Sequence, residues 1–557
     1  MAGARQSEDY FDLGTYTRPV RTKDPRAQLW FDRGLIWSYA FNHEEATACF
    51  ERAIEMDSDC AMAYFATAWS VGPNYNKPWE LFEPLELEEN LAKAVQAGKT
   101  AEEKSMLSGT PSVELALSKA IRLRYGSSGS QDRSQWNAEY ASAMEDVYKH
   151  FPDDLDVAAL YADSLMNLTP WALWDLRSGQ PAEGARTLEA KAVLDRAIAQ
   201  ANGSQHPGLL HLYIHLIEMS STPELGLFAA DSLRGLVPDA GHLHHMPTHL
   251  DVLCGDYRQV ISSNSIAMKA DERWVARAGA LNFYTLYRSH NYHFRIYGAL
   301  FAGQSKVAME TVAALESSIS DELLRVESPP MADWLEGFLS MRVHALIRFG
   351  RWGEILDLSI PEDQVLYCTT TATTHYAKGV ALSALNRVPE AEEERSLFRT
   401  AMGKVPASRT LFNNTCKDIL AVALAMLDGE LEYRRGNVDL AFESFHKAIE
   451  LGDNLPYDEP WGWMQPPRHA YGALLLEQSR IEDAAAVYAA DLGYDNTLPR
   501  ALQHPNNVWA LHGYHECLIR QDRHSEARIV KKQLDLTAAT ADIAVTSSCF
   551  CRIKASE

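Results

Sequence analysis

The stretch FDRGLIWSYAFNHEEATACFERAIEMDSDCAMAY, residues 31–64, decides the fold class. Its small and aromatic residues are spaced as in a helix–turn–helix repeat of about 34 residues. In such a repeat, small side chains let two antiparallel helices approach, and aromatic side chains fill the space between them. The residues that match the repeat positions are Trp30, which directly precedes the stretch, and Gly34, Trp37, Ala46, Phe50 and Ala53 within it. The stretch therefore predicts a pair of packed antiparallel helices.

The same spacing returns in the second half of the chain. The matching residues there are Gly429, Ala441, Phe445 and Ala448, followed by Gly472, Ala484 and Tyr488. Because each hairpin of a repeat array contacts mainly its neighbours, such an array can continue over a chain of 557 residues. We therefore predict an all-α fold, a tetratricopeptide-like α-solenoid of stacked antiparallel helix pairs.

Proline and glycine positions divide this array into expected parts. Pro19 and Pro25 mark an irregular start, and Pro329 and Pro330 interrupt the helical pattern in the middle of the chain. The expected parts are an irregular N-terminal lead-in (1–25), N-terminal helical repeats (26–205), histidine-bearing repeats with the candidate site (206–325), C-terminal helical repeats (326–540) and a C-terminal tail (541–557).

Nine of the nineteen histidines lie between His206 and His293. Turn residues such as Gly255 set the register of the repeats around them. In that register most of these histidines share one face of the first helix of each repeat, and in stacked repeats this face lines the concave groove. The residues on this face are His211, His215 and Glu218 in one repeat, His242, His245 and His249 in the next, and His290 and His293 in the third.

This histidine face has the chemistry of a metal site. Neutral imidazole binds zinc, copper, iron and nickel, and helices of adjacent repeats lie roughly 8–10 Å apart, so their imidazoles can reach one point. We expect a divalent metal ion, which would be iron, copper or zinc. The first expected ligands are His211, His215, His245 and His249. The other expected site residues are Glu218 as a further ligand or catalytic base, His242 and His293 as alternative or outer-shell metal residues, His290 as an outer-shell or substrate-binding residue, and Trp171 and Tyr297 as walls of a substrate cavity.

Two other interpretations of the histidines remain open. A single HxxxH pair is typical of half-buried helix faces, where histidine bonds to backbone carbonyls, so the residues could be structural. A clustered histidine site without metal could instead bind an acidic ligand. His206, which precedes Pro207, is expected to begin or cap a helix, and His244 is expected to be structural.

The amino-acid composition argues against some classes of binding partner. The chain has 52 basic and 75 acidic residues and a formal net charge of -23, which argues against nucleic acid or an anionic membrane as its main partner. The first residues lack an apolar signal core, and no run reaches the roughly 18–20 apolar residues of a membrane span, so we expect a cytoplasmic protein. The eight cysteines are dispersed, which favours buried thiols in a reducing compartment. Only Cys549 and Cys551 are close, as a chance pair or a pair that binds metal or oxidises.

Several segments resemble a known family. These are the opening stretch, HPGLLHLYIHLIEMSS (206–221), AGHLHHMPTHL (240–250), HNYHF (290–294) and PNNVWALHGY (505–514). Together they resemble a family of tetratricopeptide-repeat proteins of bacteria and fungi, the tetratricopeptide-repeat protein 38-like group. The resemblance implies mainly the fold. It also suggests a link to secondary-metabolite biosynthesis, because fungal members are similar to proteins encoded beside biosynthetic genes.

The function that these observations predict is metal-dependent chemistry on a small organic molecule. The reaction would be an oxidation, or a metal-assisted hydrolysis or lyase step. Motifs for nucleotide use, for an esterase nucleophile and for a zinc protease are not found in the sequence. The alternative is a non-catalytic adaptor whose groove binds a peptide or protein partner, or a second copy of the chain.

Overall fold

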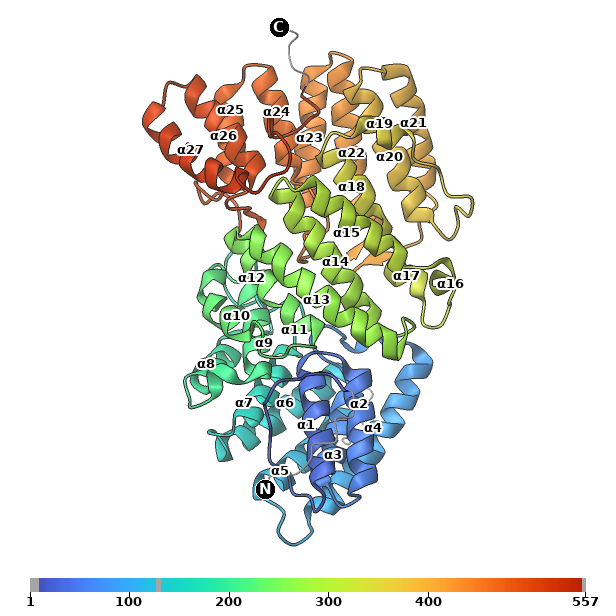
Figure 1. Ribbon diagram of the computed structural model, residues 1–557, viewed down its shortest axis with the longest axis vertical. Coiled ribbons are helices and arrows are strands. Elements are labelled where there is room, and N and C mark those ends of the chain that lie inside the picture. Colours follow the sequence, from blue (N-terminus) through green and yellow to red (C-terminus); the bar gives the residue numbers. More distant parts are fainter. Residues whose placement is uncertain (1–9, 127–131, 553–557) are drawn as a thin grey trace. The chain divides into compact units, whose positions relative to one another are not determined.

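A computed structural model describes residues 10–126 and 132–552. The fold is a tetratricopeptide-like α-solenoid of stacked antiparallel helix pairs, as the sequence predicts (Figure 1). Two compact units make up the chain: unit 1 contains Met1–Leu250 and Ile266–Ala278, and unit 2 contains Asp251–Ser265 and Gly279–Glu557. Each unit is described separately below.

Unit 1 is built from helices that follow one another as hairpins. Its α-helices are α1 (Pro25–Tyr39), α2 (His43–Met56), α3 (Ala61–Ser70), α4 (Pro84–Ser105), α5 (Ser112–Ala120), α6 (Arg133–His150), α7 (Leu155–Met166), α8 (Thr187–Ile198), α9 (Pro207–Glu218), α10 (Leu227–Leu233) and α11 (Gly241–His245). Its 3-10 helices are η1 (Trp79–Leu81), η2 (Ile121–Tyr125), η3 (Gly203–Gln205) and η4 (Pro223–Gly226). Helices α12 (Pro247–Cys254) and α13 (Tyr257–Ala278) supply residues to both units.

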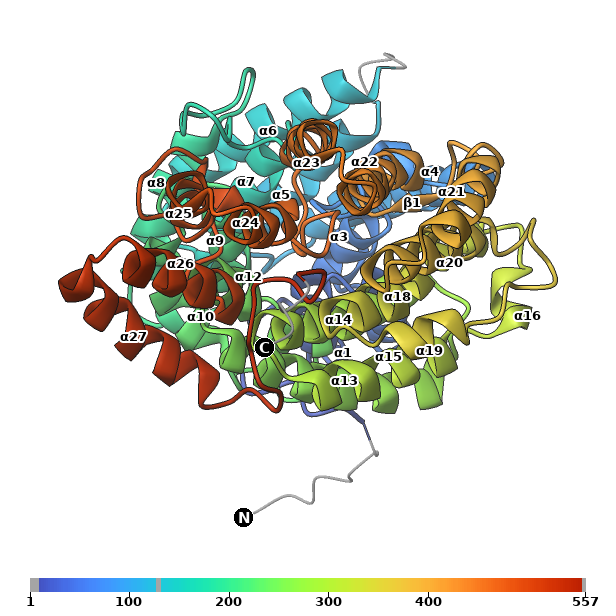
Figure 2. The same ribbon diagram turned by 90° about the horizontal axis from the view of Figure 1, so that it is seen from above.

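Unit 2 holds the remaining helices and one small hairpin. Its α-helices are α14 (Tyr284–Phe301), α15 (Ser305–Ser318), α16 (Asp321–Leu324), α17 (Met331–Leu335), α18 (Met341–Arg348), α19 (Trp352–Leu356), α20 (Cys368–Ala384), α21 (Val388–Met402), α22 (Cys416–Arg434), α23 (Val438–Asp453), α24 (Pro467–Glu477), α25 (Ile481–Asp491), α26 (Val508–Arg520) and α27 (His524–Ala538). Its other elements are η5 (Glu336–Ser340), η6 (Arg500–Leu502), and the antiparallel strands β1 (Thr410–Leu411) and β2 (Asn414–Thr415). The hairpins α20/α21 and α22/α23 stand beside each other in both ribbon views (Figure 2).

The predicted repeat positions explain how the hairpins close. A Cβ atom added to Gly34 in α1 would lie 2.5 Å from the ring of Phe50 in α2, so only glycine leaves room for that aromatic ring. The two later repeats use the same pairing of glycine with an aromatic ring. These pairs are Gly429 with Phe445, at 3.0 Å, and Gly472 with Tyr488, at 2.5 Å. Close packing of helix on helix therefore depends on the spacing that the sequence displays.

Caps fix where the first hairpin begins and turns. Asp24 accepts a hydrogen bond from the backbone of Arg26 at the start of α1, with Pro25 in the first turn. Asn42 caps α2 in the same way through the backbone N–H of Glu45. Between the two helices, Phe41 has a positive φ of 55°, which the short turn requires.

The chain ends differ from the helices between them. Residues 10–24 have no helix or strand, yet they pack on unit 1: the Trp37 Nε1–H donates to the Tyr10 hydroxyl over 2.9 Å. Residues 1–9 of the expected lead-in and 553–557 of the expected tail lie outside the described residues. Among the described residues, no helix combines the length and the apolarity that crossing a membrane requires.

Candidate functional site

Three histidines of unit 1 meet in the interior. Helix α9 presents His211 and His215 one turn apart, and α11 presents His242. One ring nitrogen from each residue lies within 4.8 Å of the others, and all three side chains are buried. We call His211, His215 and His242 the histidine cluster.

Local sequence positions the two histidines of α9. His206 caps this helix, as expected, because its Nδ1 accepts from the backbone N–H of Leu209 over 3.1 Å. Gly208 then lets α1 approach closely, since a Cβ atom there would lie 2.4 Å from the Tyr39 ring. This close approach brings the backbone of α1 within reach of His211.

Hydrogen bonds from the other ring nitrogen set the tautomers of His211 and His215. His211 Nδ1–H donates to the carbonyl oxygen of Tyr39 over 2.6 Å, and His215 Nδ1–H donates to Glu218 Oε1 over 2.7 Å. The Nε2 atom of each ring therefore carries a lone pair. Both Nε2 atoms are buried and have no hydrogen-bond partner among the part of the chain that the structure describes.

Aromatic side chains wall the histidine cluster. The ring of Phe41 lies 4.4 Å from that of His211, 5.7 Å from that of His215 and 5.6 Å from that of His242, measured between centroids. The ring centroids of Tyr75 and Trp171 lie 4.9 Å and 5.9 Å from that of His215. Trp171, an expected cavity wall, is thus next to the cluster.

Glu218 links the cluster to a second pair of histidines. Its carboxylate accepts hydrogen bonds from His215 and from His249 Nδ1, and His249 Nε2 lies 2.8 Å from His245 Nε2. Burial alone would raise the pKa of Glu218, but its contacts with His249 and His215 outweigh burial and hold that pKa below the usual value. Burial lowers the pKa of His211, His215 and His242, so these rings are neutral at pH 7.

The predicted metal residues of unit 1 lie close together in the structure. His242 joins His211 and His215, while His249 bonds to Glu218 and lies beside His245. Between these residues the helix is interrupted, because α11 ends at His245 and α12 begins at Pro247.

The other predicted site residues lie on α14 in unit 2. His293 Nε2 contacts Met464 Sδ at 2.9 Å, and the His290 ring packs 4.6 Å from that of Phe412. Tyr297 is buried with its ring 4.7 Å from that of Phe301.

Unit 2 contains a feature that sequence reasoning missed: residues 545–552 pack against its helices. Arg348 of α18 donates to the carbonyl oxygen of Ser548 over 2.5 Å, and the Ser548 hydroxyl donates to the carbonyl oxygen of His469 over 2.8 Å. Arg434 of α22 donates to the carbonyl oxygen of Cys551. We call residues 545–552 the C-terminal segment and the surface that holds it the unit 2 groove. In the sequence, the Ser-Ser-Cys-Phe-Cys run at residues 547–551 was the feature that could have indicated this packing.

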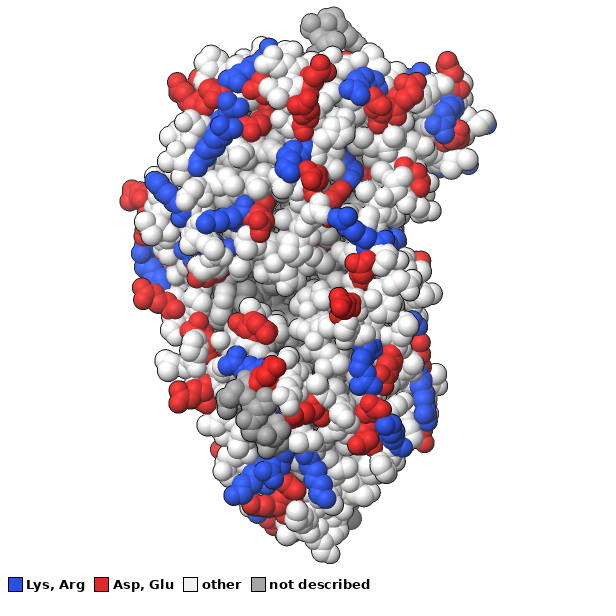
Figure 3. Space-filling view, turned by 180° about the vertical axis from the view of Figure 1, so that it is seen from behind, with Lys and Arg blue, Asp and Glu red and all other residues white. Residues whose placement is uncertain are grey.

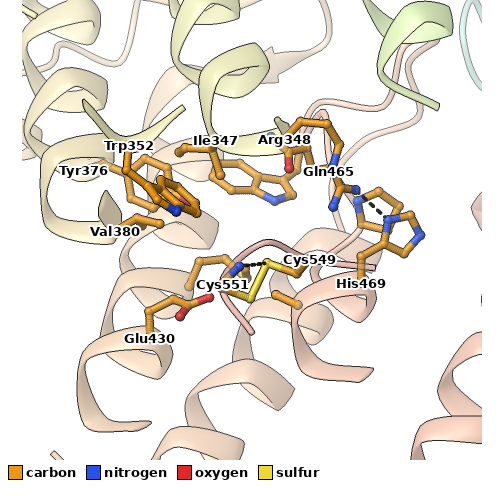
Figure 4. A pocket seen from close by; sticks show the side chains of 14 residues that line it. Ile347, Arg348, Trp352, Tyr376, Val380, Glu430, Gln465, His469, Cys549 and Cys551 are labelled. Carbon is orange, nitrogen blue, oxygen red and sulfur yellow. Dashed lines mark hydrogen bonds between the residues drawn. A yellow bond between two sulfur atoms is a disulfide. The ribbon is translucent and has the colours of Figure 1, made fainter. Parts of the chain in front are cut away.

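A small pocket adjoins the C-terminal segment (Figure 4). Cys549 and Cys551 form a disulfide that faces Trp352, Tyr376 and Glu430 across a space of about 30 Å³. Burial raises the pKa of Glu430 to about 7. The pocket is therefore lined by aromatic rings and one carboxyl group that is partly neutral at neutral pH.

Comparisons with known proteins give no family assignment. No family model and no curated protein matches the chain. Similar solved structures include the Cut9–Hcn1 hetero-tetramer of the APC/C (15% identity, 77% of this chain and 74% of that chain, TM-score 0.29). Others are an IFIT1 monomeric mutant with Gppp-AAAA (11%, 93% and 91%, 0.31) and yeast Tom70 (12%, 92% and 99%, 0.26).

The prediction of a metal-dependent enzyme for a small organic molecule is wrong, because the cavity that His211 lines with Phe41 has a volume of about 10 Å³. Such a space holds about one water molecule, whereas small-molecule pockets have roughly 300–1,000 Å³.

Proposed function

We propose that the protein is a non-catalytic repeat adaptor whose unit 2 groove binds a short segment of a protein partner. One observation carries this proposal: helices of unit 2 already hold a peptide segment without helix or strand, the C-terminal segment of the same chain. A surface that accepts one such segment has the contacts needed for another of similar chemistry.

The contacts in the groove are of two kinds. Main-chain carbonyl oxygens of the C-terminal segment accept from the guanidinium groups of Arg348 and Arg434, and such bonds do not depend on which side chains the segment carries. Side-chain contacts add selectivity. The ring of Phe550 lies 5.8 Å from that of Trp509, and the Ser548 hydroxyl lies 2.5 Å from that of Tyr488.

Surface charge supports a protein partner over a polyanion. On the face shown in Figure 3, basic and acidic side chains are interspersed among uncharged ones, and neither sign forms a broad continuous field there. The formal net charge of -23 also argues against a polyanionic partner, because like charges repel.

A peptide-binding experiment tests the proposal. A chain that ends at Ala544 retains Asp542, whose carboxylate accepts from the backbone N–H groups of Ser305 and Lys306, but lacks the C-terminal segment. A fluorescent peptide of residues 545–557 should bind this shortened chain and bind the intact chain at least tenfold more weakly, as measured by anisotropy. A peptide with Ser548→Ala should bind the shortened chain about 5–10-fold more weakly, because two hydrogen bonds are lost.

The control for this experiment is a scrambled peptide of the same composition. Circular dichroism must show that the shortened chain keeps its helices. If that folded chain does not distinguish the native peptide from the scrambled one, the proposed function is refuted.

Two finer assignments belong to this proposal. The segments around His206 and Gly241 support membership of the tetratricopeptide-repeat protein 38-like group, and the six dispersed free cysteines among the described residues support a reducing, cytoplasmic location. Fractionation of cells that express a tagged chain tests the location.

A further inference from the structure

The histidine cluster holds lone pairs that no protein donor satisfies. His211 Nε2 and His215 Nε2 are buried acceptors, because each ring places its proton on Nδ1, and neither has a hydrogen-bond partner in residues 10–126 and 132–552. Buried polar atoms in native proteins are almost always paired with protein, water or an ion. Two such atoms that face one another in an aromatic surround point to a ligand that accepts electron pairs.

We propose that His211, His215 and His242 bind one Zn²⁺ ion in the interior of unit 1. Three imidazole nitrogens form a donor set that zinc commonly takes. Zinc is chosen over magnesium or calcium because those ions prefer oxygen ligands. The bound ion would stabilise the packing of α9 on α11. Its site lies in unit 1, whereas the groove proposed to bind a partner lies in unit 2.

The spacing of the nitrogens fits an ion after small ring movements. The three ligand atoms lie within 4.8 Å of one another. If all three separations were at that limit, a central ion would lie about 2.8 Å from each nitrogen. That is ~0.7 Å beyond the zinc–nitrogen distance of about 2.0–2.1 Å. Rotation of the imidazole rings about their side-chain torsions covers this difference.

The hydrogen-bond partners of two of the proposed ligands are of the kinds found at metal centres. His215 donates to the carboxylate of Glu218, and His211 donates to the carbonyl oxygen of Tyr39. A metal-bound histidine almost always donates its other N–H to a carboxylate or a backbone carbonyl, which fixes the ring and raises its basicity. Here both arrangements occur side by side.

Metal analysis of the intact chain tests the proposal. The protein is purified without a polyhistidine tag and dialysed, and its metal content is measured by mass spectrometry. About one zinc per chain is expected. After removal of the metal with a chelator, added Co²⁺ should give a visible absorption band that Zn²⁺ then abolishes. A folded chain with less than a tenth of an equivalent of zinc, and no rebinding of either ion, overturns the proposal.

Matched variants locate the ion. His211→Gln and His242→Gln should lose the metal, with affinity lowered at least 100-fold. His244→Gln is the control: His244 lies on α11 beside His242, but its Nε2 donates to the carbonyl oxygen of Pro238 over 2.9 Å. Undiminished zinc in folded His211→Gln would overturn the assignment.

A second measurement covers the case in which the variants do not fold. X-ray absorption of the intact, zinc-loaded chain should show a coordination shell of imidazole nitrogens. A shell that contains sulfur would place the ion on cysteine thiolates, such as Cys549 and Cys551 after reduction of their disulfide, and would overturn the histidine site. This readout is independent of peptide binding, so its failure and that of the proposed function are distinguishable.

Discussion

Replacement of Gly34 by alanine should destabilise unit 1, although alanine normally favours a helix. The new methyl group would lie 2.5, 2.6 and 2.9 Å from three carbon atoms of the Phe50 ring, which is fully buried. Carbon atoms prefer a separation of about 3.5–4.0 Å, so the ring or the helix must move by ~1 Å. Overpacking of this kind costs about 2–3 kcal/mol. The gain in helix propensity returns ~1 kcal/mol, which leaves a net loss of about 1–2 kcal/mol.

Gly98→Ala is the matched control for this substitution. Gly98 lies within α4 of the same unit, and a Cβ atom there would make ordinary contacts at 3.6 Å with Arg122 and Ile121. The same change should therefore stabilise the helix by ~0.5–1 kcal/mol. Gly34→Ala combined with Phe50→Leu should recover part of the loss, because the smaller side chain vacates the space.

Hydrogen exchange read by mass spectrometry is the appropriate assay, because a chain of two compact units need not unfold in one step. Peptides from α1 and α2 report on the hairpin directly. If Gly34→Ala protects these peptides as well as Gly98→Ala does, then the glycine–aromatic pairing does not control the packing of the repeat, and the reasoning fails.

Three other predictions concern the buried charges and the two candidate sites. Asp156→Asn should cost about 2–3 kcal/mol, because Arg18 keeps Asp154 but loses the more deeply buried of its two carboxylate partners. Burial acts to raise the pKa of Asp156, but Arg18 and His206 outweigh it and depress that pKa. The stabilisation is therefore complete above the unfolded pKa of about 3.9 and is lost as the pH falls below it. The difference in free energy of unfolding between the wild type and Asp156→Asn, measured by urea titration, should shrink from pH 7 to pH 3. A difference that stays constant would contradict this prediction. Glu218→Gln should weaken zinc binding 10–100-fold in a competition titration, and an unchanged affinity would exclude a role in orienting the ligand. Arg348→Gln should speed amide exchange across residues 547–551 while exchange in α27 stays constant, and equal rates would show that Arg348 does not hold the C-terminal segment.

The sequence predicts the fold well because the packing rule is local. Gly34 and Phe50 are sixteen residues apart within one hairpin, and the pairing recurs with Gly429 and Phe445, so spacing alone identifies the repeat. The class of fold is confirmed by the structure. The division of the sequence into five parts stays a prediction. The two compact units are defined by contacts between segments that are distant in the sequence, and not by the proline and glycine positions used for that division.

The site was less accessible to sequence reasoning. The matching positions of His211 and His215 on α9 brought them together as expected, but the helix that carries the next histidines is interrupted between His245 and Pro247. Repeat positions assigned from turn residues assume an unbroken helix. They predict such an interruption only if a proline within the repeat is taken as a helix boundary despite the periodic pattern. The Tyr39 carbonyl could not be identified either, because a backbone acceptor leaves no mark in the residue pattern.

The attachment of the C-terminal segment to its own groove sets a threshold for any rival ligand. A tethered segment has an effective concentration of the order of 1 mM near its site. If its intrinsic Kd is about 10 µM, the groove is vacant for only ~1% of the time, and a free ligand binds about 100-fold more weakly than it would to a bare groove. Abundant or multivalent ligands would pass this threshold, while isolated weak motifs would be rejected without any repulsive contact.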